Sequence, residues 1–371
     1  MTDDHEHIYS LEGIDSGGLT SFLTDVLDEE VTGRELLDGA LNVVVEISTA
    51  AGNTYILRQP AKLREAAYMN SLCVEYEVLE RLAETAVPAP KPVLYCADES
   101  LLGEPFFLMA ALEGTEIPLG TDPPDRFQTP AAREQLAHEL IDTLAEIHTV
   151  EVGPFGDVCD REPAGEQVVR SADRLAEVTS ETGEQFPTLE SVGEWLRAHA
   201  PDPDESPISL VHGDYRPGNV LFAGAEQPRI TGVLDWETAM LGDPLTELAY
   251  LLLRWRDEGD PTPDLEPIAE RYGDDEMLEH LRDNNERGLA PFTARAGSPT
   301  RAELVDRYEE RTGMAFDHER FHRTHAAFGL AVVWADLHRH QVAAGEESHY
   351  PPLVAYMAAV ADSIRRGEFD L

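Results

Sequence analysis

The sequence contains very little lysine. Only Lys62 and Lys91 are present, and 28 basic residues stand against 72 acidic ones, which gives a formal net charge of −44. Nucleic acids and anionic membranes need lysine and arginine patches, so both are poor partners for this chain. A strongly acidic surface is typical of proteins that work in concentrated salt, which screens the repulsion between carboxylates. We therefore expect a salt-adapted (halophilic) protein with no nucleic-acid or membrane partner.

Cysteine is also scarce. Cys73, Cys96 and Cys159 are far apart and odd in number, which favours neither a zinc site nor a disulfide framework and fits a reducing compartment. The first residues, Met-Thr-Asp-Asp-His-Glu-His, lack the basic and apolar segments of an export signal. No uninterrupted apolar run is long enough to span a bilayer. These absences predict a cytoplasmic protein.

Apolar residues are nevertheless abundant enough for a folded enzyme. They make up 42% of the 371 residues and recur in periodic segments along almost the whole chain. An acidic disordered protein would lack such segments, so we reject that alternative. The length allows two domains or two lobes.

The most informative stretch extends from residue 208 to residue 244. Short β-prone runs occupy residues 210–211, 220–222 and 230–234. The first two bracket the polar loop His-Gly-Asp-Tyr-Arg-Pro-Gly-Asn, residues 212–219, and the third is followed by Asp235. We expect one end of a small sheet to hold Asp214, Asn219 and Asp235 together. Phosphoryl transfer needs such groups, because a carboxylate must orient the attacking hydroxyl and oxygen atoms must bind Mg²⁺.

The loop and the later segment Leu-Asp-Trp-Glu-x4-Gly-Asp-Pro, residues 234–244, resemble the two signature motifs of a known family. This is the aminoglycoside phosphotransferase-like (APH/choline kinase-type) family of small-molecule kinases, distant relatives of protein kinases. The resemblance implies an α+β, protein-kinase-like bilobal fold. It predicts a small antiparallel β-sheet lobe over residues 1–110 and a larger, mainly helical lobe over residues 111–371, with ATP between them and Mg²⁺ as the second cofactor. The oligomeric state stays open.

The resemblance gives each polar residue of the motifs a role. Asp214 is expected to act as the catalytic base or positioning group, and Arg216 to neutralise charge on the transferring phosphoryl group. Asn219 and Asp235 are the expected Mg²⁺ ligands. His212 and Asp243 are expected to brace the loop rather than to react.

The nucleotide-binding residues are expected in the first lobe. Residues 43–47 and 54–58 are β-prone and flank the turn residues Ala-Gly-Asn, which predicts a hairpin. By the resemblance, the loop before it, with Gly39 and Asn42, lies over the phosphates and Arg58 contacts them. Arginine stands here where kinases usually carry lysine, and its longer, planar group is not automatically equivalent. A nucleotide-binding protein with little catalysis is therefore the alternative.

Two other segments of this lobe complete the expected nucleotide site. The helical pattern of residues 66–82 places Glu75 as the partner of Arg58, with Glu77 as the competing candidate. The apolar strand at residues 106–110 leads into a hinge. In the family the hinge backbone meets the adenine, which here indicates Met109 and Ala111.

Several polar residues of the second lobe admit more than one interpretation. His148, at the end of a helix predicted over residues 129–150, is expected to pack or cap rather than to act as a base. Glu247 stands where relatives usually have aspartate, and we expect the longer acid to reach back to the catalytic loop. His318, His322 and His325 have near-helical spacing that could suit a metal, but surface or packing histidines are the favoured interpretation.

Arginine gives the best indication of the acceptor. Of 26 arginines, 12 lie between Arg254 and Arg339. Two explanations stay open: these arginines pair with nearby acids at the surface, or some of them, with Arg254 and Arg256 as first candidates, bind a carboxylate or phosphate on the acceptor. Residues 306–342 resemble the acyl-CoA-dehydrogenase-linked branch of the family. We predict transfer to a small-molecule hydroxyl on a hydroxy acid or hydroxyacyl thioester, with an aminoglycoside, sugar or amino-alcohol kinase as the alternative.

Overall fold

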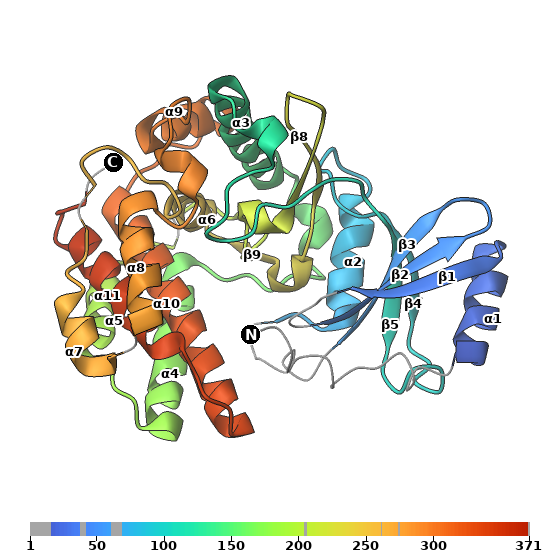
Figure 1. Ribbon diagram of the computed structural model, residues 1–371, viewed down its shortest axis with the longest axis horizontal. Helices are drawn as coiled ribbons and strands as arrows, with labels where there is room; N and C mark the ends of the chain where they lie inside the picture. Colours follow the sequence, from blue (N-terminus) through green and yellow to red (C-terminus); the bar gives the residue numbers. More distant parts are fainter. Residues whose placement is uncertain are drawn as a thin grey trace. The chain divides into compact units, whose positions relative to one another are not determined.

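The computed structural model describes residues 16–37, 42–60, 69–203, 206–260, 262–273 and 275–369. The chain divides into two compact units (Figure 1). The first unit comprises Met1–Glu113 and Thr231–Ala239, and the second comprises Gly114–Ile230 and Met240–Leu371. An antiparallel sheet dominates the first and helices dominate the second, which confirms the predicted α+β class.

The sheet of the first unit has five strands in the order β1-β2-β3-β5-β4. They are β1 (Val31–Leu37), β2 (Asn42–Thr49), β3 (Thr54–Pro60), β4 (Pro92–Cys96) and β5 (Phe106–Ala110). Every neighbouring pair is antiparallel, and β2 and β3 form the predicted hairpin. Gly52 adopts φ 85° in the hairpin turn, a conformation that glycine reaches without steric cost.

Helices α1 (Ser16–Leu27) and α2 (Leu72–Leu82) cover opposite faces of this sheet (Figure 1). Leu23 of α1 is buried in one core cluster with Leu57, whereas Tyr76 of α2 contacts Phe107, with 5.9 Å between the ring centroids. Side chains alternate between faces along a strand, so Arg58, next to Leu57, faces α2. The alternation of side chains along β3 therefore places the buried Arg58 guanidinium next to Glu75 of α2.

Helix α2 begins later than the sequence pattern predicted. Residues 69–71 are not helical, and residues 66–68 lie outside the described ranges, as does Gly39 of the expected phosphate loop. The side chain of Ser71 accepts a hydrogen bond from the Val74 amide and thereby caps the helix. A serine cap satisfies an amide that has no partner inside the helix, which fixes the first turn at Leu72.

The second unit is built from long helices. They are α3 (Pro130–His148), α4 (Ala164–Thr182), α5 (Pro187–His199), α6 (Pro244–Leu252), α7 (Glu266–Tyr272), α8 (Asp275–Arg287), α9 (Arg301–Thr312), α10 (Glu319–Ala344) and α11 (Tyr350–Arg365). Helices α4, α5, α10 and α11 share one apolar core, to which they contribute Val168, Leu189, Phe328 and Met357. The helix predicted over residues 129–150 corresponds to α3.

Two short strand pairs carry the catalytic motifs. Strand β6 (Ser209–Val211) pairs with β9 (Met240–Gly242), and β7 (Val220–Ala223) pairs with β8 (Arg229–Val233). The prediction that the three β-prone runs form one small sheet was therefore wrong. The partner of β6 is a three-residue strand, which is too short to show strand periodicity in the sequence.

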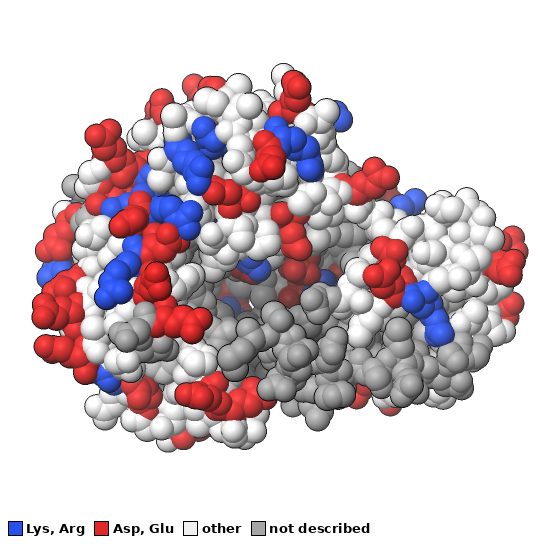
Figure 2. Space-filling model, in the orientation of Figure 1, with Lys and Arg blue, Asp and Glu red and all other residues white. Residues whose placement is uncertain are grey.

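Acidic side chains are spread over the visible surface, and arginines lie among them (Figure 2). Among the described residues, no helix combines the length and the apolar character that crossing a bilayer requires.

Candidate active site

Asp214 is the centre of the polar loop in the second unit. The Asn219 side-chain amide donates to Oδ2 of Asp214 at 2.8 Å and to its backbone carbonyl at 3.0 Å. Nε of Arg216 also donates to Oδ2, at 3.1 Å, and the Tyr250 hydroxyl donates to Oδ1. The carboxylate is held from three sides, yet its side chain is 34% exposed. A small molecule can therefore reach a fixed carboxylate.

The pKa of Asp214 lies below its usual value. Desolvation by the surrounding protein would raise this pKa, but the charges of Arg216 and Arg254 and the hydrogen bond from Tyr250 lower it more. The carboxylate therefore stays ionised near neutral pH and can accept a hydrogen bond from an approaching hydroxyl. Sequence reasoning missed Tyr250, because at its position on α6 it has only the spacing of an ordinary packing residue.

Glu247 of α6 fixes the beginning of the loop. Its Oε2 accepts from the His212 amide at 2.9 Å, and its Oε1 accepts from the Gly213 amide at 2.6 Å. Nε2 of His148 lies 2.9 Å from Oε2, and its Nδ1 lies 2.6 Å from the Tyr308 hydroxyl. The expectation that the longer acid reaches the loop is confirmed. His148 holds this acid in place, which agrees with the prediction that it is not a base.

We expect Glu247→Gln to weaken this brace. A neutral amide accepts with one oxygen only, so one of the three contacts of this side chain, with the His212 amide, the Gly213 amide or His148, is lost, at a cost of about 2 kcal/mol in the free energy of unfolding. Burial alone would raise the pKa of Glu247, but the hydrogen bonds and charges of His148 and His212 lower it below 4.5. Its stabilisation is thus complete above pH 4.5 and is lost as the pH falls through the lower folded pKa.

Denaturant unfolding at neutral pH and at pH 4 measures this effect. Glu368→Gln is the matched control, because Glu368 and its partner Arg366 have side chains that are 51% and 52% exposed, and losing such a surface pair should change stability little. Equal unfolding free energies for Glu247→Gln and the parent chain at neutral pH would show that the Glu247 carboxylate does not stabilise the loop.

Asp243 does not brace the loop, so that prediction was wrong. Its Oδ1 accepts from the Leu245 amide at 3.1 Å, and Oδ2 bonds Thr246 and lies 2.8 Å from Nδ1 of His322. Asp243 precedes a helix, where a short acid satisfies the first free amides, so it caps α6 instead.

The histidines of α10 serve packing and hydrogen bonding. Nδ1 of His325 lies 3.2 Å from the Thr246 hydroxyl, and burial lowers the pKa of His325 to about 4. The favoured packing interpretation fits these contacts. Within the described part of the chain, no three His, Cys, Asp or Glu side chains are arranged to hold a metal.

The first unit contains a second polar centre, around Arg58. Its Nη1 lies 2.9 Å from Oε1 of Glu75 and 2.8 Å from Oδ1 of Asp235, and its Nη2 bonds Glu237. The predicted pair with Glu75 is present, and Glu77 accepts instead from the Cys73 thiol. Burial would lower the pKa of Arg58, but the three carboxylates raise it.

Asp235 is the exposed member of this centre, with 44% of its side chain accessible. It adopts the left-handed conformation, with φ 61° and ψ 60°, ahead of the short 3-10 helix η6 (Trp236–Thr238). Residues other than glycine pay for this conformation, and such strain concentrates at functional sites. Glu237 was not predicted as a site residue. The carboxylate of Glu237 also accepts a hydrogen bond from the Asn42 side chain at 3.5 Å. In the sequence, only the position of Glu237 in the second motif could have indicated that it is a site residue.

The expected adenine-contacting residues lie at the end of β5. Met109 is buried on the strand, opposite Ile56 of β3. The Ala111 amide donates to the Thr54 carbonyl at 3.1 Å. The N–H of Ala111 is therefore occupied by the sheet and is not a donor for a nucleotide in this arrangement.

The braced loop around Asp214 and the buried pair of Arg58 with Glu75 are the features expected of a kinase-like phosphotransferase. The model of the phosphotransferase enzyme family (APH) matches residues 32–280, and the chain belongs to this family. Acyl-CoA dehydrogenase family member 11 of Pongo abelii is 31% identical over 202 residues, which are 54% of this chain and 25% of that protein. The chain thus spans about a quarter of the length of this relative and of its human counterpart.

Solved structures confirm the kinase-like fold. A Ralstonia eutropha JMP134 protein assigned as an aminoglycoside phosphotransferase superimposes with a TM-score of 0.71 at 24% identity, covering 96% of this chain and 99% of that one. Aminoglycoside phosphotransferase APH(4)-Ia, solved with AMP-PNP and hygromycin B, gives a TM-score of 0.56 at 15% identity, covering 95% and 98%. At these identities the likeness concerns the fold.

Proposed function

We propose that this phosphotransferase moves the γ-phosphoryl group of ATP to a hydroxyl of a small molecule in a Mg²⁺-dependent reaction. The observation that carries the proposal is the partly exposed carboxylate of Asp214, held by Asn219, Arg216 and Tyr250 with a lowered pKa. A fixed, ionised carboxylate can orient an acceptor hydroxyl and take its proton as the new O–P bond forms. Arg216 would neutralise charge on the transferring group.

The donor groups suit the proposed cofactors. Mg²⁺ in kinases is usually held by one or two protein side chains together with phosphate oxygens, so the absence of a three-residue cluster among the described residues is compatible with it. Asn219 gives its amide nitrogen to Asp214, which turns its carbonyl oxygen away from that carboxylate. This oxygen and Asp235 would be the protein ligands. When bound, Mg²⁺ would neutralise phosphate charge.

Arg58 and Glu75 would set the position of the phosphates. Arginine offers a planar fork that matches phosphate oxygens, and its three acidic partners fix that fork. Asn42, Met109 and Ala111 remain proposed nucleotide contacts, the last through its carbonyl. The alternative, a nucleotide-binding protein with little catalysis, is disfavoured by the complete set of groups around Asp214.

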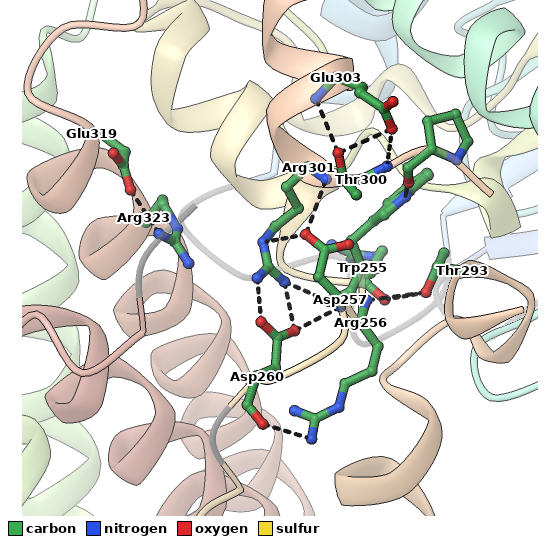
Figure 3. A network of polar contacts seen from close by, with 12 residues as sticks. Trp255, Arg256, Asp257, Asp260, Thr293, Thr300, Arg301, Glu303, Glu319 and Arg323 are labelled. Atoms are coloured by element: carbon green, nitrogen blue, oxygen red, sulfur yellow. Dashed lines mark hydrogen bonds and ion pairs between the residues drawn. The ribbon is translucent and has the colours of Figure 1, made fainter.

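The acceptor proposal concerns a hydroxy acid or hydroxyacyl thioester. Many arginines of the C-terminal part simply pair with acids at the surface, among them Arg271, Arg287, Arg295, Arg307 and Arg311. Arg256 also has a structural place, since its Nη2 donates to the Asp260 carbonyl at 2.9 Å, in a network in which Arg301 binds Asp260 and Asp257 (Figure 3). Most of the arginine excess is therefore explained by pairing, and Arg254 remains as the acceptor candidate.

An acceptor screen with ATP and Mg²⁺ tests the proposed function. We expect hydroxy acids or their coenzyme A thioesters to be phosphorylated and kanamycin-type sugars not to be, with products identified by mass spectrometry. Molar KCl should be present, because a net charge of −44 is weakly screened at low ionic strength. Efficient turnover of aminoglycosides, simple sugars or amino alcohols without turnover of hydroxy acids would support the alternative kinase class instead.

A further inference from the structure

Arg254 differs from the other buried arginines of the described residues. Arg58 and Arg301 each bind more than one carboxylate, Arg323 binds Glu319, and Arg133 donates three hydrogen bonds to backbone carbonyls. Arg254 is only 2% exposed, yet its single side-chain hydrogen bond goes to the Tyr250 carbonyl, one turn back on α6. Its Nε is buried with no hydrogen-bond partner, as are the Nε atoms of Arg58 and Arg301, but those two side chains make ion pairs through other nitrogens. Arg254 acts on Asp214 through its charge, but no carboxylate of the described residues forms an ion pair with it, so this buried guanidinium would be stabilised by an anionic ligand.

This guanidinium lies beside the catalytic carboxylate. The Arg254 guanidinium carbon is 4.0 Å from the centre of the Tyr250 ring, and the hydroxyl of the same ring donates to Oδ1 of Asp214. Arg254 and the carboxylate are therefore separated by about one tyrosine ring. All three residues belong to the second unit.

The hydrogen bonds around Asp214 also show from which side an acceptor can approach. An ionised carboxylate oxygen accepts about two hydrogen bonds. Oδ2 already receives one from Asn219 and one from Arg216, whereas Oδ1 receives only that of Tyr250. The remaining acceptor position is on Oδ1, so an incoming hydroxyl lies next to the Tyr250 hydroxyl, on the side of Arg254.

We propose that Tyr250 and Arg254 form the acceptor subsite, in which Arg254 binds a carboxylate of the acceptor while the acceptor hydroxyl shares Oδ1 of Asp214 with Tyr250. This inference rests on the proposed function and narrows its substrate class. A carboxylate at Arg254 and a hydroxyl at Asp214 must be close together, which selects a compact free hydroxy acid. In a thioester the carboxylate is masked, and the phosphates of its carrier lie far from the hydroxyl.

The test compares each hydroxy acid with its own amide, which keeps the hydroxyl and removes the charge. With Arg254→Met we expect the KM for hydroxybutyrate to rise about 10- to 100-fold, because a charge-assisted hydrogen bond is lost. The KM for hydroxybutyramide and that for ATP should change less than about three-fold. Arg287→Met is the matched control, since it removes one positive charge from an exposed pair with Asp283 and should leave every KM unchanged.

Two further variants keep the test decisive. Arg254→Lys retains the charge without the planar fork, should give an intermediate KM for the acid, and replaces Arg254→Met if that variant fails to fold. Tyr250→Phe keeps the ring under Arg254 and removes the hydrogen bond to Oδ1 of Asp214, so kcat should fall about 10-fold while the KM for ATP stays within about three-fold. An unchanged kcat would exclude Tyr250 as a positioning residue.

The outcomes separate this inference from the proposed function. If Arg254→Met raises the KM for acids and for amides equally, the carboxylate subsite is overturned while the kinase assignment stands. The same conclusion follows if the parent chain prefers coenzyme A thioesters to pantetheine thioesters and Arg254→Met abolishes that preference. Calorimetric binding of hydroxybutyrate that Arg254→Met weakens, without any phosphoryl transfer, would support the subsite and reject the kinase. Neither binding nor transfer of any hydroxy acid would overturn both.

Discussion

Asp214→Asn should lower kcat at least about 100-fold, the usual contribution of a positioned base, while ATP binding in the presence of Mg²⁺ stays within a few-fold of the parent value. The reason lies in the hydrogen bonds around this side chain. Asn219 and Arg216 are both donors, so the asparagine must turn its only oxygen toward them. Its NH₂ group then faces Tyr250 and the approaching hydroxyl, which needs an acceptor and meets a donor.

Steady-state kinetics and calorimetry with a non-hydrolysable nucleotide measure the two halves of this expectation. Asp283→Asn is the control, because Asp283 is 40% exposed and pairs only with Arg287 of its own helix. A rate above about a tenth of the parent value in Asp214→Asn would remove Asp214 from its catalytic role, since a positioned base contributes more than that.

Asp235→Ala should raise the Mg²⁺ concentration for half-maximal activity by roughly 10- to 100-fold, because groups in the shells around a metal commonly contribute that much to affinity or activity. The fold should tolerate the change, since Arg58 keeps Glu75 and Glu237 as partners. Asn219→Ala should have a smaller effect, because it removes a neutral ligand rather than a charge.

Magnesium titrations of activity and calorimetry of metal-dependent nucleotide binding test this prediction. Asp235→Asn separates charge from backbone strain, because asparagine also tolerates the left-handed conformation that Asp235 adopts. Asp98→Ala, at an exposed turn of the same unit, is the control. Unchanged metal-dependent binding in Asp235→Ala would show that this carboxylate is not a ligand.

The sequence by itself determined the elements and the order of the motifs. Alternation of β-branched residues predicted the hairpin of β2 and β3, and the loop from His212 to Asn219 lies between strands as its flanking apolar runs indicated. Both are local patterns, in which the side-chain period and the turn residues are visible within a few positions. The pairing of Arg58 with Glu75 was predictable only through the family resemblance.

The tertiary structure alone decided which polar groups meet. The partner of β6, the cap that Asp243 provides for α6 and the shift of the start of α2 depend on contacts that short segments do not encode. Tyr250 and Arg254 look like ordinary residues of an apolar helix in the sequence. Their importance arises because folding places the Tyr250 hydroxyl on Asp214 and buries the Arg254 guanidinium beside the same ring without an ion pair to an acid. Residue spacing fixes which face of a helix a side chain occupies, but only packing fixes what that face touches.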